Sequence, residues 1–242
     1  MMKVKNKIFA IGYNKTASTS LHELFTKNNI KSIHRYSYKD VAANPKVNFF
    51  SDTGDVLSIE KEVNYRQLYK DHANALFILN TRSLNGWLKS RMIHNYWIAH
   101  REGNQHKVTN LNYQQYSTEL IQHRISEYKK IIQFFKDKKD NFLILDIDLE
   151  DWQCFLTRNL RLQHFNIKSN VTRPSGNRYA NTKNTNIKHI PPKDLSRING
   201  SISSTFKELG IKDFTNSILP KEFCTNSEAE IIRSYTSNLS TQ

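Results

Sequence analysis

The chain has 242 residues, of which 38% are hydrophobic, and a formal net charge of +14. We expect one domain over residues 1–242, with a core at about 7–165 and a polar loop and C-terminal helical extension over 166–242. Two cysteines, Cys154 and Cys224, exclude a disulfide framework and cannot form a zinc site by themselves. No apolar run approaches membrane-spanning length, so we expect no membrane span.

Apolar runs and amphipathic segments alternate along the chain. Strands are predicted at residues 7–11, 31–34, 47–51, 75–80 and 141–147. Helices are predicted at 19–28, 60–71, 84–101, 116–136 and 193–209, where Gly210 could stop the last one. Strands separated by helices require right-handed crossovers, so the pattern predicts an α/β fold with a parallel central sheet and helices on both faces. Ligands of such sheets bind at the carboxyl ends of the strands.

The positive charge favours anionic ligands. The basic residues are spread along the sequence rather than gathered in a tail. No zinc-finger spacing or aromatic RNA-binding signature accompanies them in the sequence. We therefore expect no nucleic acid partner.

The most informative segment is residues 8–21, Ile-Phe-Ala-Ile-Gly-Tyr-Asn-Lys-Thr-Ala-Ser-Thr-Ser-Leu. It joins an apolar strand to a helix through a loop rich in Ser and Thr. Backbone N–H groups and the positive end of the helix dipole converge at such a turn, so the loop can hold an anionic group. The segment predicts a nucleotide-type ligand and a three-layer sandwich like that of P-loop proteins.

The lysine of this loop is displaced. When Gly12 is aligned with the first glycine of G-x-x-x-x-G-K-[ST], Ala17, Ser18 and Thr19 stand at the second glycine, the lysine and the Mg²⁺-binding hydroxyl. The lysine of the chain is Lys15, in the middle of the loop. This arrangement argues against an ordinary ATP-hydrolysing site.

The pattern G-x-x-K-T-[GA]-[ST]-[ST]-S-L resembles the 5′-phosphosulfate loop of sulfotransferases that use 3′-phosphoadenosine-5′-phosphosulfate (PAPS), with bacterial sulfotransferases as the nearest likeness. The resemblance implies that PAPS is the co-substrate. It assigns donor binding to the following loop residues: Gly12, Asn14, Lys15, Thr16, Ala17, Ser18, Thr19 and Ser20.

A second segment fits the same family. In sulfotransferases an arginine that closes a strand and a serine eight residues later bind the 3′-phosphate of the donor, and Arg82 and Ser90 have this spacing. A guanidinium group offers a planar, charged fork for phosphate oxygens. The alternative is a solvated arginine and a serine on an exposed helix face. The resemblance also makes Arg173 and Arg178, in the polar segment 166–190, candidates for the 3′-phosphate site, with a plain surface loop as the alternative.

The chemistry implied is the transfer of a sulfonate group while a phosphate leaves. Lys15 is expected to stabilise the charge on the bridging oxygen, with the backbone amides of residues 16–20 around the 5′-phosphate. The alternative for Lys15 is an ordinary exposed lysine. Lys15, Arg82 and the amides supply the positive field, so we expect no metal.

Two residues compete as the general base. Asp52 lies in Phe-Phe-Ser-Asp-Thr-Gly-Asp, which resembles the T-D-x-P region of bacterial sulfotransferases with glycine in place of proline. The alternative is that Asp52 or Asp55 caps the turn. His34, at the end of the second predicted strand, is the rival because histidine titrates near neutral pH. His94 and His100 are substrate contacts only if their helix lines the site.

Two other classes of function stay open. One is a P-loop kinase or phosphotransferase, which Mg²⁺-dependent ATP turnover would reveal. The other is a non-catalytic module that binds nucleotides or polyanions. The acceptor is not specified: a glycan, a lipid or a small alcohol would fit, and the positive charge slightly favours an acidic one.

Location is predicted from the N-terminus. The apolar run after the basic residues 1–7 is too short for a signal peptide, so we expect a cytoplasmic location. The sequence does not indicate the oligomeric state.

Overall fold

The computed structural model describes residues 7–52, 64–103, 112–148, 152–162, 167, 190–212, 219 and 225–236. Its elements, in chain order, are β1 (Ile8–Ala10), α1 (Ser18–Lys27), β2 (Ser32–His34), α2 (Tyr38–Ala43), β3 (Phe49–Ser51), α3 (Tyr65–Asp71), β4 (Leu76–Thr81), α4 (Leu84–Arg101), α6 (Tyr113–Phe135), the 3₁₀ turn η1 (Lys139–Asn141), β5 (Phe142–Asp146), α7 (Trp152–Leu162), α9 (Pro192–Glu208) and α10 (Asn226–Thr236).

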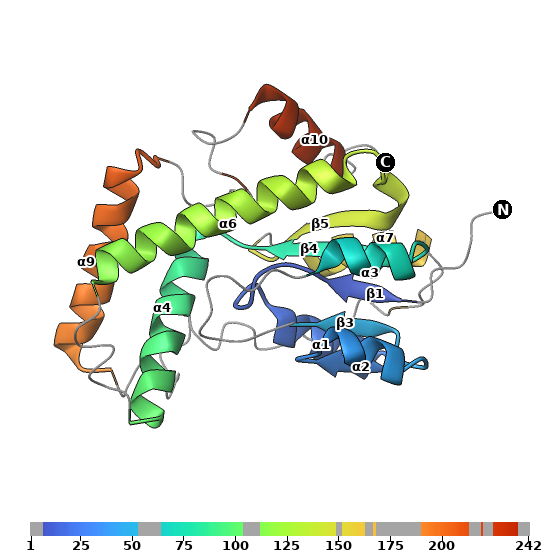
Figure 1. Cartoon of the computed structure of the whole chain (residues 1–242), viewed down its shortest axis with the longest axis horizontal. Helices are drawn as coiled ribbons and strands as arrows, with labels where there is room; N and C mark the ends of the chain where they lie inside the picture. The colour runs from blue at the N-terminus through green and yellow to red at the C-terminus, as the bar shows by residue number, and fades with distance from the viewer. Residues whose placement is uncertain are drawn as a thin grey trace.

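The described strands form one parallel sheet in the order β2-β3-β1-β4-β5. Ile8 in β1 is in register with Phe49 of β3 and Leu76 of β4. Successive side chains of these strands point to opposite faces, as the twofold period of a strand requires. Both faces are apolar, so the sheet is covered on both sides (Figure 1).

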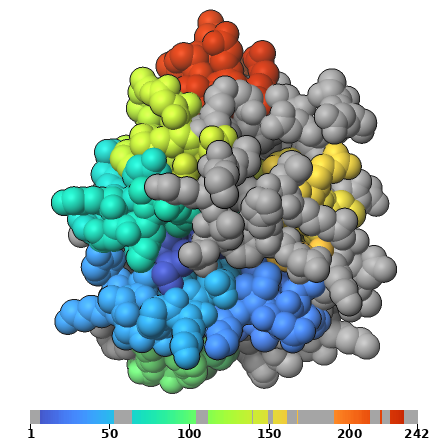
Figure 2. All heavy atoms as spheres, turned by 90° about the vertical axis from the view of Figure 1, so that its right-hand side faces the viewer, coloured from blue at the N-terminus to red at the C-terminus, as the bar shows by residue number. Residues whose placement is uncertain are grey.

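Different helices cover the two faces. On one face, Leu21 and Phe25 of α1 and Leu156 of α7 pack against the sheet. Helices α3, α4, α6 and α9 contribute to the core on the other face. Figure 2 shows the end of the molecule away from the carboxyl ends of the strands, with α10 at the top and α3 at the left of the view. The predicted α/β fold with a parallel sheet between two helical layers is confirmed.

The bounds of the elements differ from the predictions by a few residues. Strands β1, β2, β3 and β5 are shorter than the apolar runs that predicted them, and β4 continues to Thr81. The longest helix begins at Tyr113 rather than at residue 116, because the side chain of Asn112 accepts a hydrogen bond from the backbone of Gln115 and caps it. Residues 60–63 of the predicted helix 60–71 lie outside the described residues.

The short helix α2 was not predicted. A capping box at its start, in which Ser37 and Asp40 bond each other's backbone N–H groups, explains why residues 38–43 are helical. This Ser-x-x-Asp spacing is a signal present in the sequence.

The order of the strands gives the loop after β1 a special position. The chain runs from β1 to β2 and β3 on one side of β1 and then to β4 and β5 on the other. The carboxyl end of β1 therefore lies where the direction of the connections changes, which is where open α/β sheets bind ligands.

Candidate functional site

Asn80, near the end of β4, fastens the loop that follows β1. Its side chain is fully buried and accepts a hydrogen bond from the Gly12 N–H at 3.0 Å. Its amide nitrogen donates to the Thr16 carbonyl at 2.8 Å and to the Thr16 hydroxyl at 2.7 Å. One side chain thus ties the start of the loop to its end, and the loop shape is fixed before any ligand binds.

Gly12 is required by this packing. A Cβ atom at this position would lie 1.9 Å from the carbonyl oxygen of Asn80. Only glycine allows the backbone of the loop to pass so close to β4. The structural role of Gly12 is therefore to let the backbone of the loop pass close to β4.

The middle of the loop is in an unusual conformation. Lys15 and Ala17 have φ values of 67° and 65°, in the left-handed region that residues with a Cβ rarely adopt. Helix α1 begins at Ser18 and has no acidic residue in its first turn. The N–H groups of this first turn have no partner within the helix, so they provide a positive end without an internal counter-charge.

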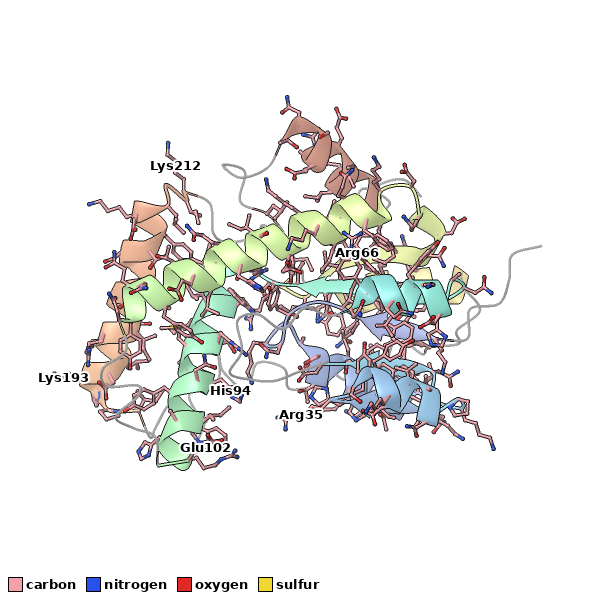
Figure 3. All side chains as sticks on the ribbon, viewed as in Figure 1. Arg35, Arg66, His94, Glu102, Lys193 and Lys212 are labelled. Atoms are coloured by element: carbon pink, nitrogen blue, oxygen red, sulfur yellow. The ribbon has the colours of Figure 1, made fainter. Side chains whose placement is uncertain are left out.

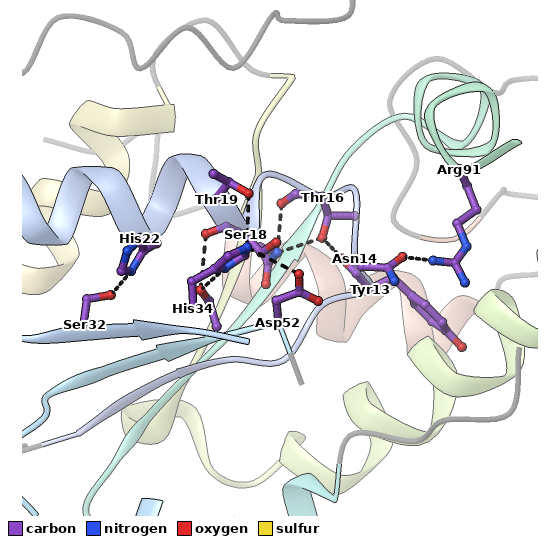
Figure 4. A network of polar contacts seen from close by, with 12 residues as sticks. Tyr13, Asn14, Thr16, Ser18, Thr19, His22, Ser32, His34, Asp52 and Arg91 are labelled. Carbon is purple, nitrogen blue, oxygen red and sulfur yellow. Dashed lines mark hydrogen bonds and ion pairs between the residues drawn. The ribbon is translucent and has the colours of Figure 1, made fainter. Parts of the chain in front are cut away.

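Charged residues in the left-handed conformation follow all three neighbouring strands β2, β3 and β1. Arg35 comes directly after β2 with φ 64°, Asp52 directly after β3 with φ 63°, and Lys15 lies in the loop after β1. Each such conformation costs of the order of 1 kcal/mol or more and tends to occur at functional sites. Asp52 lies between His34 on one side and the loop on the other (Figure 4).

Helix α4 adds a buried arginine to this group. The Nη1 atom of Arg91 donates to the side-chain oxygen of Asn14 at 2.6 Å (Figure 4). The indole of Trp87, one turn earlier, donates to the Asn14 carbonyl at 3.1 Å. These two hydrogen bonds to Asn14 hold the loop against α4. The guanidinium of Arg91 therefore lies beside the loop.

The result is a site with excess positive charge. Burial lowers the pKa of Lys15 from 10.5 to about 8; Asp52 opposes this shift, and the charges of Arg91 and Arg35 reinforce it. Burial and the charge of Lys15, followed by those of the arginines, lower the pKa of His94 on α4 to about 3. His94 is therefore neutral at physiological pH, and the group favours an anion.

The imidazole of His34 has a defined orientation. The hydroxyl of Ser51 donates to the Ser18 carbonyl at 3.3 Å, so it accepts from His34 Nδ1, which is 3.1 Å away. In this tautomer the neutral imidazole carries its proton on Nδ1, and Nε2 can accept one. Burial lowers the pKa of His34, and the neighbouring Asp52 carboxylate, with Oδ2 3.5 Å from Nε2, opposes this shift.

Arg82 and Ser90 lie along one side of α4. The guanidinium of Arg82 folds over the first turn of the helix, so that a Cβ atom on Gly86 would lie 3.0 Å from its Nη2 atom. Ser90 is four residues after Gly86 and shares its helix face. Arg82 itself follows Asn80 by two residues, about 7 Å in a strand, so it stands at the same sheet edge as the loop.

Arg82 also has an acidic neighbour that no motif indicated. Its Nη2 atom lies 3.5 Å from Oδ1 of Asp148, and the same carboxylate accepts a hydrogen bond from the Ser83 N–H at 2.8 Å. Asp148 thus lies at the N-terminus of α4, against the group expected to bind a phosphate.

A second buried arginine supports this end of the site. Arg124, on α6, donates through Nη2 to the Thr81 hydroxyl at 2.8 Å and to the Arg82 carbonyl at 2.7 Å. Its guanidinium packs on the rings of Trp87 and Tyr128. These contacts fix the backbone at the carboxyl end of β4, from which the Arg82 side chain projects.

The structure brings Lys15, His34 and Asp52 together at the carboxyl ends of β1, β2 and β3. Of the hydroxyl groups in the loop, that of Thr16 is bonded within the loop, Ser18 and Ser20 are buried, and Thr19 is exposed with Oγ1 3.2 Å from His34 Nε2.

Some predicted residues lie apart from this group or outside the described residues. His100 contacts the ring of Tyr96. Asp55, Arg173 and Arg178 lie outside the described residues. Asn80, Arg35 and Arg91 are functional candidates that no sequence motif marked; an asparagine within the apolar strand 75–80 is the one visible signal.

Comparisons of the chain with protein-family models, curated proteins and solved structures give no match. None of the helices in the described part of the chain combines the length and hydrophobicity needed to cross a membrane. Within the same residues, no three His, Cys, Asp or Glu side chains gather as metal ligands would.

Proposed function

We propose that this chain is a sulfotransferase that moves a sulfonate group from PAPS to a hydroxyl or amine of an acceptor. The observation that carries the proposal is the position of Lys15. It lies largely buried within a fixed loop between β1 and α1, near Arg35, Arg91 and the Asp52 carboxylate. A phosphate dianion bound there would relieve the repulsion among the cations and accept hydrogen bonds from the first turn of α1.

The two ends of the donor are assigned to different strands. The 5′-phosphosulfate lies against Lys15 and the amides of residues 16–20, at the end of β1. The 3′-phosphate lies at the end of β4 between Arg82 and Ser90. The close approach of Arg82 to Gly86, one turn before Ser90, supports this pairing.

The transfer step can be written with these residues. The acceptor oxygen or nitrogen forms a bond to the donor sulfur, the bond between sulfur and the bridging oxygen breaks, and adenosine 3′,5′-bisphosphate leaves. Lys15 stabilises the charge on the departing phosphate oxygen. The acceptor proton moves to Nε2 of His34, and Asp52 stabilises the imidazolium that forms.

The hydrogen bond from His34 Nδ1 to Ser51 favours His34 over Asp52 as the base, since it leaves Nε2 unprotonated in the neutral ring. Asp52 is then a positioning and charge-stabilising residue. The proposal uses both candidates, each in a distinct role.

The test is a calorimetric titration of the protein with adenosine 3′,5′-bisphosphate and, separately, with ATP and Mg²⁺. We expect tighter binding of the bisphosphate without metal, and transfer of ³⁵S from labelled PAPS to acceptors in a mixed panel. Arg82→Gln should weaken bisphosphate binding at least tenfold, whereas Arg66→Gln, an exposed arginine on α3, should not. Preferential binding and turnover of Mg²⁺-ATP would refute the proposal in favour of a phosphotransferase.

A further inference from the structure

The charged residues at the carboxyl edge follow the order of the strands. Along β2, β3, β1 and β4, the residues after each strand include Arg35, Asp52, Lys15 and Arg82 in turn. The proposed donor spans the β1 and β4 part of this edge. In-line transfer requires the nucleophile to approach sulfur opposite the leaving phosphate, so a donor laid along the edge from β4 to β1 receives its acceptor over β3 and β2. Arg35 lies at the far end of that path.

Arg35 is held firmly although its side chain is exposed. Its N–H donates to the Ser51 carbonyl at 2.9 Å, and the next residue, Tyr36, donates to the Asp52 carbonyl at 3.2 Å. These bonds extend the pairing of β2 with β3 beyond the strands and hold the left-handed conformation of Arg35. The guanidinium therefore projects from a rigid backbone at the edge of the sheet.

Helix α4 forms the opposite side of this region. His94 and Arg35 lie on the same side of the molecule, between α4 and helices α1 and α2 in the view of Figure 3, and the charge of Arg35 reaches His94. His94 stacks on Trp97, and the guanidinium of Arg101 lies over the Trp97 ring. The α4 side therefore presents a neutral imidazole, and Arg101 beyond it pairs with Glu102 at 3.9 Å.

The carboxylate of this region already interacts with other residues of the site. Asp52 lies beside His34 and Lys15, as the proposed transfer requires. Among the described residues, no Asp or Glu carboxylate forms an ion pair with Arg35 or Arg91. A carboxylate or phosphate group of a ligand would balance this charge.

We propose that the acceptor carries, besides its nucleophilic hydroxyl or amine, an acidic group that Arg35 binds. This inference rests on the proposed function, since it takes the β1 and β4 part of the edge as the donor site. It makes Arg35 a specificity residue: neutral acceptors lack the group that Arg35 recognises. The acidic group is a carboxylate, as in an acidic sugar, or a phosphate, because both present oxygen pairs to a guanidinium.

The test uses inorganic sulfate as the probe of the acidic-group site. The protein is saturated with adenosine 3′,5′-bisphosphate, and sulfate is titrated calorimetrically at constant ionic strength. The variant Arg35→Asn removes the charge and keeps a residue that tolerates positive φ. Lys39→Asn, at an exposed position on α2, removes the same charge elsewhere. Arg35→Lys keeps the charge without the fork, and Arg35→Gly provides a second variant compatible with the backbone.

We expect sulfate to bind wild type and Lys39→Asn alike, at least tenfold more weakly to Arg35→Asn and Arg35→Gly, and with intermediate affinity to Arg35→Lys. Equal sulfate affinity in wild type and Arg35→Asn would overturn the inference while leaving the donor site intact. Failure of the bisphosphate to bind any of these proteins would instead refute the proposed function, on which the inference about Arg35 rests.

In turnover assays with PAPS, paired acceptors that differ in one acidic group provide the corresponding check. Methyl glucuronide and methyl glucuronamide form such a pair for sugars, and 4-hydroxybenzoate and 4-hydroxybenzamide for phenols. In any pair that the enzyme accepts, the acidic member should be turned over in preference to the neutral one. Arg35→Asn should reduce that preference at least tenfold. Preference for the neutral member would contradict the inference.

Discussion

Replacing Lys15 with methionine should stabilise the ligand-free protein and weaken donor binding. The pKa of Lys15 falls from 10.5 to about 8, first because of burial and despite Asp52. This shift corresponds to about 3 kcal/mol of unfavourable free energy for keeping the ammonium group charged in the folded state. Methionine has a similar length and no charge, so Lys15→Met removes the penalty. For a chain of this size, 3 kcal/mol raises Tm by about 6 to 12 °C.

The pH dependence identifies the cause. Below pH 8, Lys15 is protonated in both folded and unfolded chains, so the full penalty applies. Between pH 8 and 10.5 the unfolded chain binds more protons than the folded one, and the stability of wild type rises with pH. Above 10.5 the penalty vanishes. The stability advantage of Lys15→Met should therefore shrink across this window.

The assay is thermal unfolding of wild type, Lys15→Met and the exposed control Lys39→Met from pH 7 to 10.5. Each protein is measured with and without adenosine 3′,5′-bisphosphate. The ligand should raise the Tm of wild type and Lys39→Met by more than that of Lys15→Met. A Lys15→Met protein that is less stable than wild type at pH 7, or whose Tm difference does not fall between pH 8 and 10.5, would refute the reasoning.

Three further predictions concern Asn80, which fastens the loop after β1, Asp148 beside Arg82, and the general base. Asn80→Ala leaves buried groups of the loop without their partner and should reduce the free energy of unfolding in urea by about 3 kcal/mol. A loss below about 1 kcal/mol would argue against the role of Asn80 in fastening the loop. Asp148→Asn removes a carboxylate 3.5 Å from Arg82 and should tighten adenosine 3′,5′-bisphosphate binding in calorimetry; weaker binding would mean that Asp148 orients the arginine instead. At saturating donor, His34→Ala should lower kcat more than Asp52→Asn does and remove the acidic limb of the pH–rate profile. The reverse order would make Asp52 the base.

Much of the fold follows from patterns that the sequence carries openly. The apolar runs and the helical period placed the strands and the longer helices because both faces of the sheet are buried, and residues 84–101 are helical as predicted. The two motifs that predict donor binding lie at the carboxyl ends of neighbouring strands, as the parallel topology requires. Strand ends were less predictable because the apolar run continues past the last paired residue, as at Ile11 after β1.

The site was less predictable because its geometry depends on contacts between distant residues. Asn80 meets Gly12 across 68 positions of the chain and Arg91 meets Asn14 across 77, and one sequence carries no record of such pairings. The left-handed conformation of Arg35 is equally invisible, since arginine rarely adopts positive φ, and the tolerance of aspartate for this region is only a weak signal at Asp52. Asp148 was given no role in the sequence analysis and lies outside the two donor motifs, yet it lies against the arginine of one of them.

The central claim is that Lys15 and Arg82 hold opposite ends of one nucleotide. The most direct measurement compares the Kd of adenosine 3′,5′-bisphosphate with that of adenosine 5′-monophosphate for wild type, Lys15→Met and Arg82→Gln. Lys15→Met should weaken binding of both nucleotides, because both have the 5′-phosphate. Arg82→Gln should weaken only the bisphosphate, by at least tenfold. If Arg82→Gln left bisphosphate affinity unchanged, or weakened both nucleotides equally, the assignment of the two ends would be wrong.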